Sequence, residues 1–156
     1  MSKSLKRVRA ALEALGAPTT IVETQLARTA ADAAKAVDCE IDQIAKSIIF
    51  KGENSGEAIL FVTAGGNKVD PAKAAELAGE PLGKADASLI RLQTGFAIGG
   101  VSPIGHLNPI RAFVDPRLKD FDQIWAAAGT PNHVFACTPT DLLNFCDSQV
   151  SDFTEK

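Results

Sequence analysis

The stretch from Gly95 to Pro109 places the strongest limit on how this chain can fold. Four glycines and two prolines interrupt its apolar residues. Glycine permits backbone angles that other residues avoid, and proline removes an amide donor, so the stretch predicts an irregular loop. Backbone N–H groups of such a loop can face a ligand when rigid elements hold its ends. We therefore expect this loop, which contains Ser102 and His106, to belong to a functional site.

Length and apolar content predict a single domain. The chain has 156 residues, of which 46% are apolar, so residues 1–156 can fill one core. No run approaches the roughly 18 apolar residues of a membrane span. The start of the chain mixes basic and acidic residues with leucine at helical spacing, unlike a signal peptide. We expect no membrane partner and no export.

Cysteine usage and charge limit the compartment and the partners. Cys39, Cys137 and Cys146 lack Cys-x-x-Cys spacing, which suits a reducing compartment and predicts a cytoplasmic location. His106 and His133 do not stand at metal-ligand spacing, so we expect no metal and no cofactor. The formal net charge of −3 argues against a DNA-coating protein, although a local basic patch could still dock one end of an RNA.

Apolar periodicity and capping residues predict the regular elements. Helices are expected over Lys3–Leu15, Thr29–Val37, Pro71–Leu77, Asp86–Gly95 and Phe121–Ala128, and from Pro139 onward. Strands are expected over Thr20–Glu23, Ile44–Lys51, Glu57–Ala64, Ile110–Asp115 and His133–Cys137. An Asn-Ser-Gly turn joins the second strand to the third, which predicts a central hairpin and argues against an all-parallel sheet. We expect an α+β fold with one mixed, mostly antiparallel sheet surrounded by helices, and a frayed tail over residues 147–156.

Two groups of basic residues have alternative interpretations. Lys46 begins a predicted strand among apolar neighbours, where a cation needs a route to water or an anionic partner. It is therefore either a solvent-facing residue or a ligand-binding one. Lys3, Lys6 and Arg7 lie on the polar side of the first helix. They form either a solvated face or a contact for RNA phosphates.

The glycine-rich loop does not fit the templates of common catalytic motifs. His106 and Leu107 stand where a P-loop needs lysine and a hydroxyl. A nucleophile elbow needs Gly-x-Ser-x-Gly, but Pro103 follows Ser102 directly and the second glycine comes one residue late. What remains is a lysine on a core strand and a loop of N–H groups, which together could hold an anionic or ester-bearing ligand.

Several segments, in this order along the chain, resemble the YbaK and prolyl-tRNA-synthetase-associated domain family. The matching segments are Thr29–Ala34, Ile44–Phe50, Lys84–Asp86, Gly95–His106, Asp115 and Gly129–Asn132. The resemblance implies a mixed sheet curled toward a barrel. It also implies hydrolysis, in trans, of the ester that joins a wrong amino acid to tRNA, most often tRNA for proline.

The resemblance also implies a site. Lys46 matches the family's strand lysine and is the expected catalytic residue. The expected substrate-binding residues are Gly99, Gly100, Val101, Ser102, Pro103, Gly105, His106, Thr29 and Asn132. Val134 stands near the point where some members have an aspartate, and His133 lies in the region where others carry a histidine. The accepted amino acid stays open among Ala, Cys and Ser.

Three functions follow as hypotheses. The first is a free-standing aminoacyl-tRNA deacylase that uses substrate-assisted attack of water and has a synthetase as a possible partner. The second is a non-catalytic module that binds tRNA or a synthetase through the same pocket. The third is a hydrolase of small esters or amides.

Overall fold

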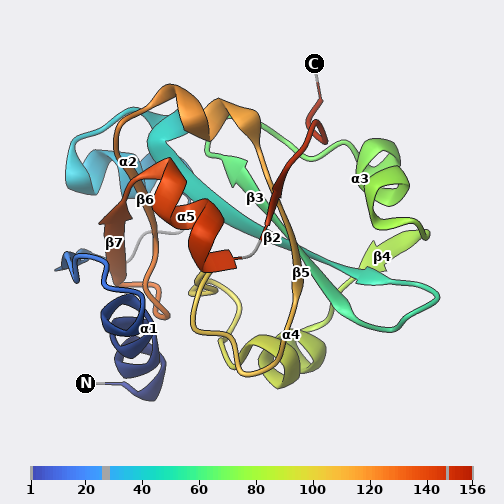
Figure 1. The fold of residues 1–156 in the computed structure, drawn as a ribbon, viewed down its shortest axis with the longest axis horizontal. Coiled ribbons are helices and arrows are strands. Elements are labelled where there is room, and N and C mark those ends of the chain that lie inside the picture. Colours follow the sequence, from blue (N-terminus) through green and yellow to red (C-terminus); the bar gives the residue numbers. More distant parts are fainter. Residues whose placement is uncertain (1, 26–28, 147, 156) are drawn as a thin grey trace.

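Strands β2 (Ile44–Gly52) and β3 (Ala58–Ala64) form the central antiparallel hairpin of this computed structural model, which describes residues 2–25, 29–146 and 148–155. The hairpin lies within a mixed sheet whose strand order is β1-β7-β6-β2-β3-β5-β8, with β4 paired to β2 (Figure 1). Every residue of β3 is buried, because other strands flank it on both edges and side chains cover both of its faces. The predicted hairpin and mixed sheet are confirmed.

The other elements surround this hairpin. The remaining strands are β1 (Ile21–Glu23), β4 (Leu82–Lys84), β5 (Arg111–Val114), β6 (Ile124–Ala127), β7 (His133–Cys137) and β8 (Gln149–Val150). The helices are α1 (Lys3–Ala14), α2 (Ala30–Val37), α3 (Pro71–Ala78), α4 (Ala87–Thr94) and α5 (Pro139–Cys146), with short 3-10 turns η1 (Ile41–Gln43) and η2 (Pro116–Asp120). Within the described ranges, no helix is long and apolar enough to cross a membrane.

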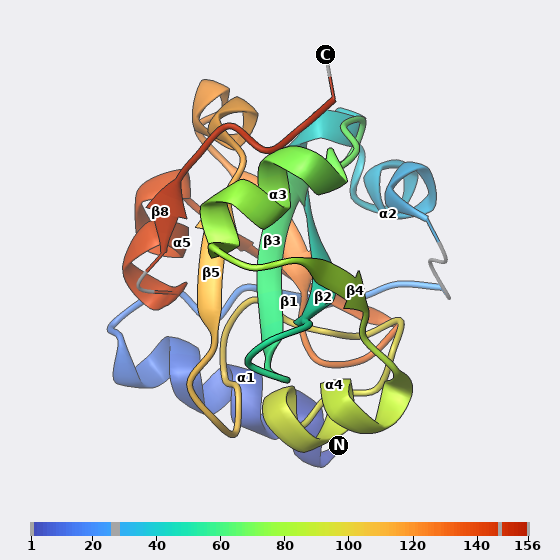
Figure 2. The same ribbon diagram turned by 90° about the vertical axis from the view of Figure 1, so that its right-hand side faces the viewer.

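The two faces of β3 bury two different cores. Leu60 and Val62 pack in the larger core with α1 and α5, whereas Ile59 and Phe61 pack in a second core with α3. Alternate strand residues point to opposite faces, so one apolar strand serves both layers. Figures 1 and 2 show α3 on one side of the hairpin and α1 and α5 on the other.

Local capping signals fix the ends of several helices as predicted. The side chains of Thr29, Asp70 and Asp86 accept hydrogen bonds from backbone N–H groups in the first turns of α2, α3 and α4. Gly79 and Gly95 end α3 and α4 with φ angles of 76° and 81°, a left-handed conformation that glycine adopts without steric cost. Gly95 therefore starts the glycine-rich loop directly at the end of α4.

The predicted helix over Phe121–Ala128 is wrong, because this segment contains strand β6. Ile124 and Ala126 are buried while the residues between and after them are half-buried, which is the two-residue period of a strand. β6 pairs with β7 on one edge and with β2 on the other. Pairing on both edges overrides the helix preference of the alanines.

The predicted frayed tail is also wrong for the described residues 148–155. Strand β8 pairs in parallel with β5, and Thr154 forms a β-bridge with Val69. Phe153 is fully buried and packs edge-on against Phe61 with a centroid distance of 5.1 Å. Because the residues around Phe153 are mostly polar, the sequence did not indicate that its side chain is buried.

We expect Phe153→Ala to lower the free energy of unfolding by about 3–5 kcal/mol, because it empties the centre of the second core. Urea unfolding of the variant and the wild type measures the difference. Val150→Ala is the matched control, since Val150 lies on the same segment but is 38% exposed. Equal effects of the two substitutions would show that the tail contributes little to the core.

Candidate functional site

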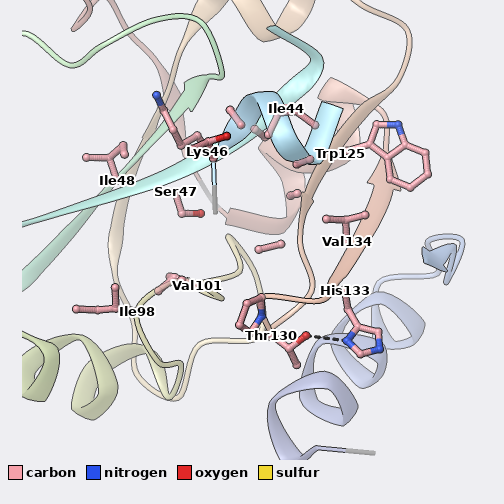
Figure 3. A pocket seen from close by; sticks show the side chains of 18 of the residues that line it. Ile44, Lys46, Ser47, Ile48, Ile98, Val101, Trp125, Thr130, His133 and Val134 are labelled. Carbon is pink, nitrogen blue, oxygen red and sulfur yellow. Dashed lines mark hydrogen bonds between the residues drawn. The ribbon is translucent and has the colours of Figure 1, made fainter. Parts of the chain in front are cut away.

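A cavity of about 430 Å³ opens beside β2 and between six other segments (Figure 3). That volume lies within the range of small-molecule sites. The segments are the start of α2, helix α4 at Ile90, the glycine-rich loop, the turn before β7, and the strands β6 and β7. The lining residues are Thr29, Ala30, Ala33, Ile44, Ala45, Lys46, Ser47, Ile48, Ile49, Ile90, Ile98, Gly99, Val101, Trp125, Ala126, Ala127, Thr130, Pro131, His133 and Val134.

The cavity exists because β2 changes partners along one edge. On that edge Ile44 and Ala45 pair with β6, and residues 50–52 pair with β4. Between these two contacts, residues 46–49 have no strand partner on this edge within the described chain. A strand edge left without a partner presents backbone N–H and C=O groups, so the cavity wall is polar in its main chain and apolar in most of its side chains.

Lys46 and the glycine-rich loop share this cavity. The Lys46 ammonium donates hydrogen bonds to the carbonyl oxygens of Asn67 and Gly65, at 3.0 and 3.4 Å. Figure 3 shows the side chain extending away from Thr130 and His133. Burial lowers the pKa of the Lys46 ammonium below its usual value, and the charge of Lys68 lowers it further. An ammonium has three donors, so one remains for a ligand.

Gly99 and Val101 line the cavity, and Gly100 fixes the loop beside it. A Cβ added to Gly100 would lie 2.8 Å from the Cα of Thr130, closer than such atoms approach one another. Only glycine therefore lets the loop contact the backbone of the turn before β7. This contact joins two walls of the cavity that are distant in sequence.

Ser102 and His106 support the loop from inside. Ser102 is fully buried, and its hydroxyl accepts a hydrogen bond from the Ile104 amide. The Nε2–H of His106 donates to the Ser102 carbonyl at 2.7 Å, because a carbonyl can only accept. The His106 ring also packs edge-on against Phe96. Pro103 is buried next to Ser102, and neither residue is among those that line the cavity.

Arg7 also holds the loop. Its Nε donates to the Gly105 carbonyl at 2.7 Å and its Nη2 to the Thr94 carbonyl at 3.3 Å. The guanidinium lies 4.5 Å from the centre of the Phe96 ring, a cation–π contact. Arg7 thus clamps both ends of the loop to α1, and these contacts favour a structural interpretation over a tRNA contact.

The other predicted site residues are spread over the cavity and the surface. Thr29 lines the cavity and caps α2. Asn132 lies in the turn before β7, where its carbonyl accepts a hydrogen bond from the Thr24 amide. Lys3 and Lys6 are exposed on α1, so they are available to a partner but do not line the cavity.

The turn before β7 presents a polar pair to the cavity. The Thr130 hydroxyl lies 2.7 Å from Nδ1 of His133 and accepts a hydrogen bond from the Asn132 amide (Figure 3). The hydroxyl proton can point at Nδ1, and in that arrangement the proton of a neutral imidazole lies on Nε2. His133 then offers an N–H donor at the cavity wall.

Sequence reasoning did not assign several lining residues. Trp125 and Val134 lie on β6 and β7, and Ser47 follows Lys46 on β2. The resemblance had pointed to the position of Val134 but not to its side-chain contacts. The sequence offered no two-residue alternation around Trp125, because residues 124–127 are all apolar. In the part of the chain that the structure describes, no three His, Cys, Asp or Glu side chains gather as metal ligands.

Residues 24–145 match the aminoacyl-tRNA editing domain. The chain therefore belongs to this family of editing domains, and its mixed, curled sheet matches the fold of a candidate trans-editing enzyme.

Individual relatives span nearly the whole chain. The uncharacterized protein YwhH of Bacillus subtilis (strain 168) is 32% identical over 148 residues, which cover 94% of each chain. The crystal structure of a candidate trans-editing enzyme for prolyl-tRNA synthetase has a TM-score of 0.92 and 44% identity, and the match covers 100% of this chain and 99% of the other. The hypothetical protein APE2540 has a TM-score of 0.86 and 27% identity, over 96% of this chain and 99% of the other.

We expect Arg7→Ala to lower the free energy of unfolding by about 1–3 kcal/mol, because it removes a cation–π contact and two hydrogen bonds from a charged donor. Urea unfolding measures the loss. Lys6→Ala is the control, because Lys6 is an exposed neighbour on α1 and its replacement should change stability by less than about 0.5 kcal/mol. A negligible effect of Arg7→Ala would contradict the clamp.

The buried imidazole of His106 predicts a pH dependence of stability. Burial lowers its pKa below 6.5, the Ser102 hydrogen bond opposes the shift, and the charge of Arg7 adds to it. The unfolded chain then binds this proton more readily, so stability falls as pH drops from 6.5 to the lower folded pKa. His106→Gln can keep the hydrogen bond without titrating, and we expect a shallower pH slope of the unfolding free energy. Identical slopes for wild type and variant would contradict this assignment.

Proposed function

We propose that this chain is a free-standing deacylase that hydrolyses, in trans, the ester between a mischarged small amino acid and tRNA. The proposed amino acids are Ala, Cys and Ser, and the proposed carrier is tRNA for proline. The observation that carries the proposal is the shared cavity of Lys46 and the glycine-rich loop in a member of the editing-domain family. The similarity to the candidate trans-editing enzyme for prolyl-tRNA synthetase supports the choice of tRNA.

The side chains around the cavity favour hydrolysis without a protein nucleophile. Ser102 is buried, and its hydroxyl is held by the Ile104 amide. No cysteine is among the described lining residues. An aminoacyl ester has a ribose hydroxyl beside it that can orient a water molecule, so a covalent enzyme intermediate is not needed.

In the proposed reaction, water attacks the ester carbonyl and the bond to the ribose oxygen breaks. The water oxygen stays on the amino acid as its carboxylate, one proton of the water goes to the ribose oxygen, and the other is released to solvent. Backbone N–H groups at the cavity wall and Nε2–H of His133 are the donors available to the negative charge on the carbonyl oxygen. The third N–H of Lys46 would bind a phosphate or hydroxyl of the terminal nucleotide at the rim.

The proposed selectivity depends on size. β-branched side chains such as Ile44, Ile48 and Val101 enclose the cavity, and their rotamers are stiff. A synthetic site separates side chains that differ by one methylene by only about 1–3 kcal/mol, so editing requires a second site that admits only the smaller ones. We propose that this cavity serves as that second site.

We expect the protein to accelerate loss of alanine, cysteine or serine from tRNA and to leave correctly charged prolyl-tRNA intact. The measurement is the deacylation rate of each charged tRNA with and without the protein. Binding of charged tRNA without faster deacylation would instead support a non-catalytic module that uses Lys3 and Lys6. Equal turnover of free aminoacyl esters would support a small-ester hydrolase.

We expect Lys46→Ala to lower kcat/KM for deacylation at least about 100-fold, since it removes the cation at the rim together with its role in binding. The fold should persist, because Lys46 is only partly buried. Circular dichroism tests the fold, and single-turnover deacylation tests the activity. Lys51→Ala is the matched control, because Lys51 is exposed on the same strand. Wild-type activity of the Lys46 variant would remove lysine from the proposed mechanism.

A further inference from the structure

The open edge of β2 presents the main chain of Ser47 and Ile49 to the cavity. The Gly52 amide donates to the Glu57 carbonyl, so Gly52 directs its backbone groups toward β3. Backbone direction alternates along a strand. Residues 48 and 46 therefore also point to β3, while residues 47 and 49 point to the opposite edge. That edge has no strand partner between β6 and β4 within the described chain.

Ser47 adds a buried hydroxyl to the same place. Its Oγ is buried and has no hydrogen-bond partner within the described structure. Buried polar groups are usually satisfied, so an orphaned one at a cavity wall indicates a partner that the protein itself does not supply. Figure 3 shows this hydroxyl pointing toward the side of the cavity where Val134 lies. Lys46, the preceding residue, points to the other face of the strand.

The cavity offers no acidic partner for a positively charged ligand group. None of its described lining residues is Asp or Glu. An amino acid attached to tRNA through its carboxyl group carries a free α-amino group, and this group must meet neutral oxygen acceptors here. Thr29 Oγ already accepts from Asp32, and Thr130 Oγ from Asn132. Each of these two hydroxyls keeps a second lone pair, but Ser47 Oγ is the lining hydroxyl that has no partner at all among the described residues. The carbonyl oxygens at the open edge of β2 are further neutral acceptors.

We propose that Ser47 binds the α-amino group of the aminoacyl substrate through its hydroxyl and its carbonyl oxygen. This inference rests on the proposed function, since it assigns a ligand group within the same site. The aminoacyl group then lies along β2 like one residue of an added strand, with its carbonyl oxygen near the Ser47 amide. Ser47 would thereby position the ester, and the cavity would prefer acyl groups that carry an amine.

A pair of ligands that differ only in the amine tests this assignment. The probes are adenosine with a 3′-alanylamide, which cannot be hydrolysed as an ester, and adenosine with the 3′-propionamide, which lacks the amine. For the wild type we expect the alanyl probe to bind about tenfold more tightly, the effect of one hydrogen bond to a charged group. We expect Ser47→Ala, which removes the hydroxyl and keeps the main-chain carbonyl, to reduce this preference, and Ser47→Thr, which keeps the hydroxyl, to retain it in full. Titration calorimetry gives each Kd.

Thermal unfolding separates this role from a structural one. Because the Ser47 hydroxyl has no partner among the residues that the structure describes, Ser47→Ala should not lower Tm. The inference is overturned if wild type binds neither probe or both equally, if Ser47→Ala keeps the preference in full, or if Ser47→Ala weakens both probes alike. Because binding is measured without hydrolysis, an amine preference in a protein that deacylates no tRNA would retain this inference while rejecting the proposed function.

Discussion

Strand β2 is paired along its whole length with β3, but its other edge is divided between β6 and β4. The two partners are held by different parts of the fold, because β6 continues into β7 while β4 precedes α4. Within the described chain neither strand pairs with residues 46–49, so a gap remains there. The candidate site depends on this gap, since the surrounding helix, loop and turn only close a space that the sheet leaves open.

Polar residues near the site divide into two groups with different roles. Ser102, His106 and Arg7 use their hydrogen bonds within the protein, and they fix the glycine-rich loop against α1 and Phe96. Ser47 Oγ lies at the cavity without a hydrogen-bond partner among the described residues, and the Lys46 ammonium, which extends to the other face of β2, keeps one donor beyond its two carbonyl partners. A loop that is rigid without a ligand loses little entropy when one binds, so this division suits a preorganised site.

Local signals in the sequence predicted much of the fold. Capping residues and αL glycines act within one helical turn, so Asp70, Asp86 and Gly95 could be interpreted without knowledge of tertiary contacts. The prediction for the segment around Trp125 was wrong because its alanines favour a helix, whereas pairing with β2 and β7 makes the segment a strand. Strand β2 is far away in sequence, and β7 follows after a turn. The prediction of a frayed tail was wrong for the same reason, since the partners of Phe153 lie on β3 and β5.

The sequence predicted which loop and which strand form the site, but not the hydrogen bonds that their side chains make. The sequence brought the Lys46 strand and the glycine-rich loop together through a family resemblance, and the structure places both at one cavity. Sequence alone could not show that the hydroxyl of Ser102 is used internally while that of Ser47 is not. Which of two serines is satisfied depends on partners that only the folded chain positions.

The clamp formed by Arg7 has a consequence for how the protein is made. Arg7 and Gly105 are separated by 98 positions in the chain, so α1 leaves the ribosome long before the loop that it holds. Closing so large a segment is entropically unfavourable and slow. The hydrogen bond from Arg7 that holds the loop therefore cannot form before Gly105 has been synthesised.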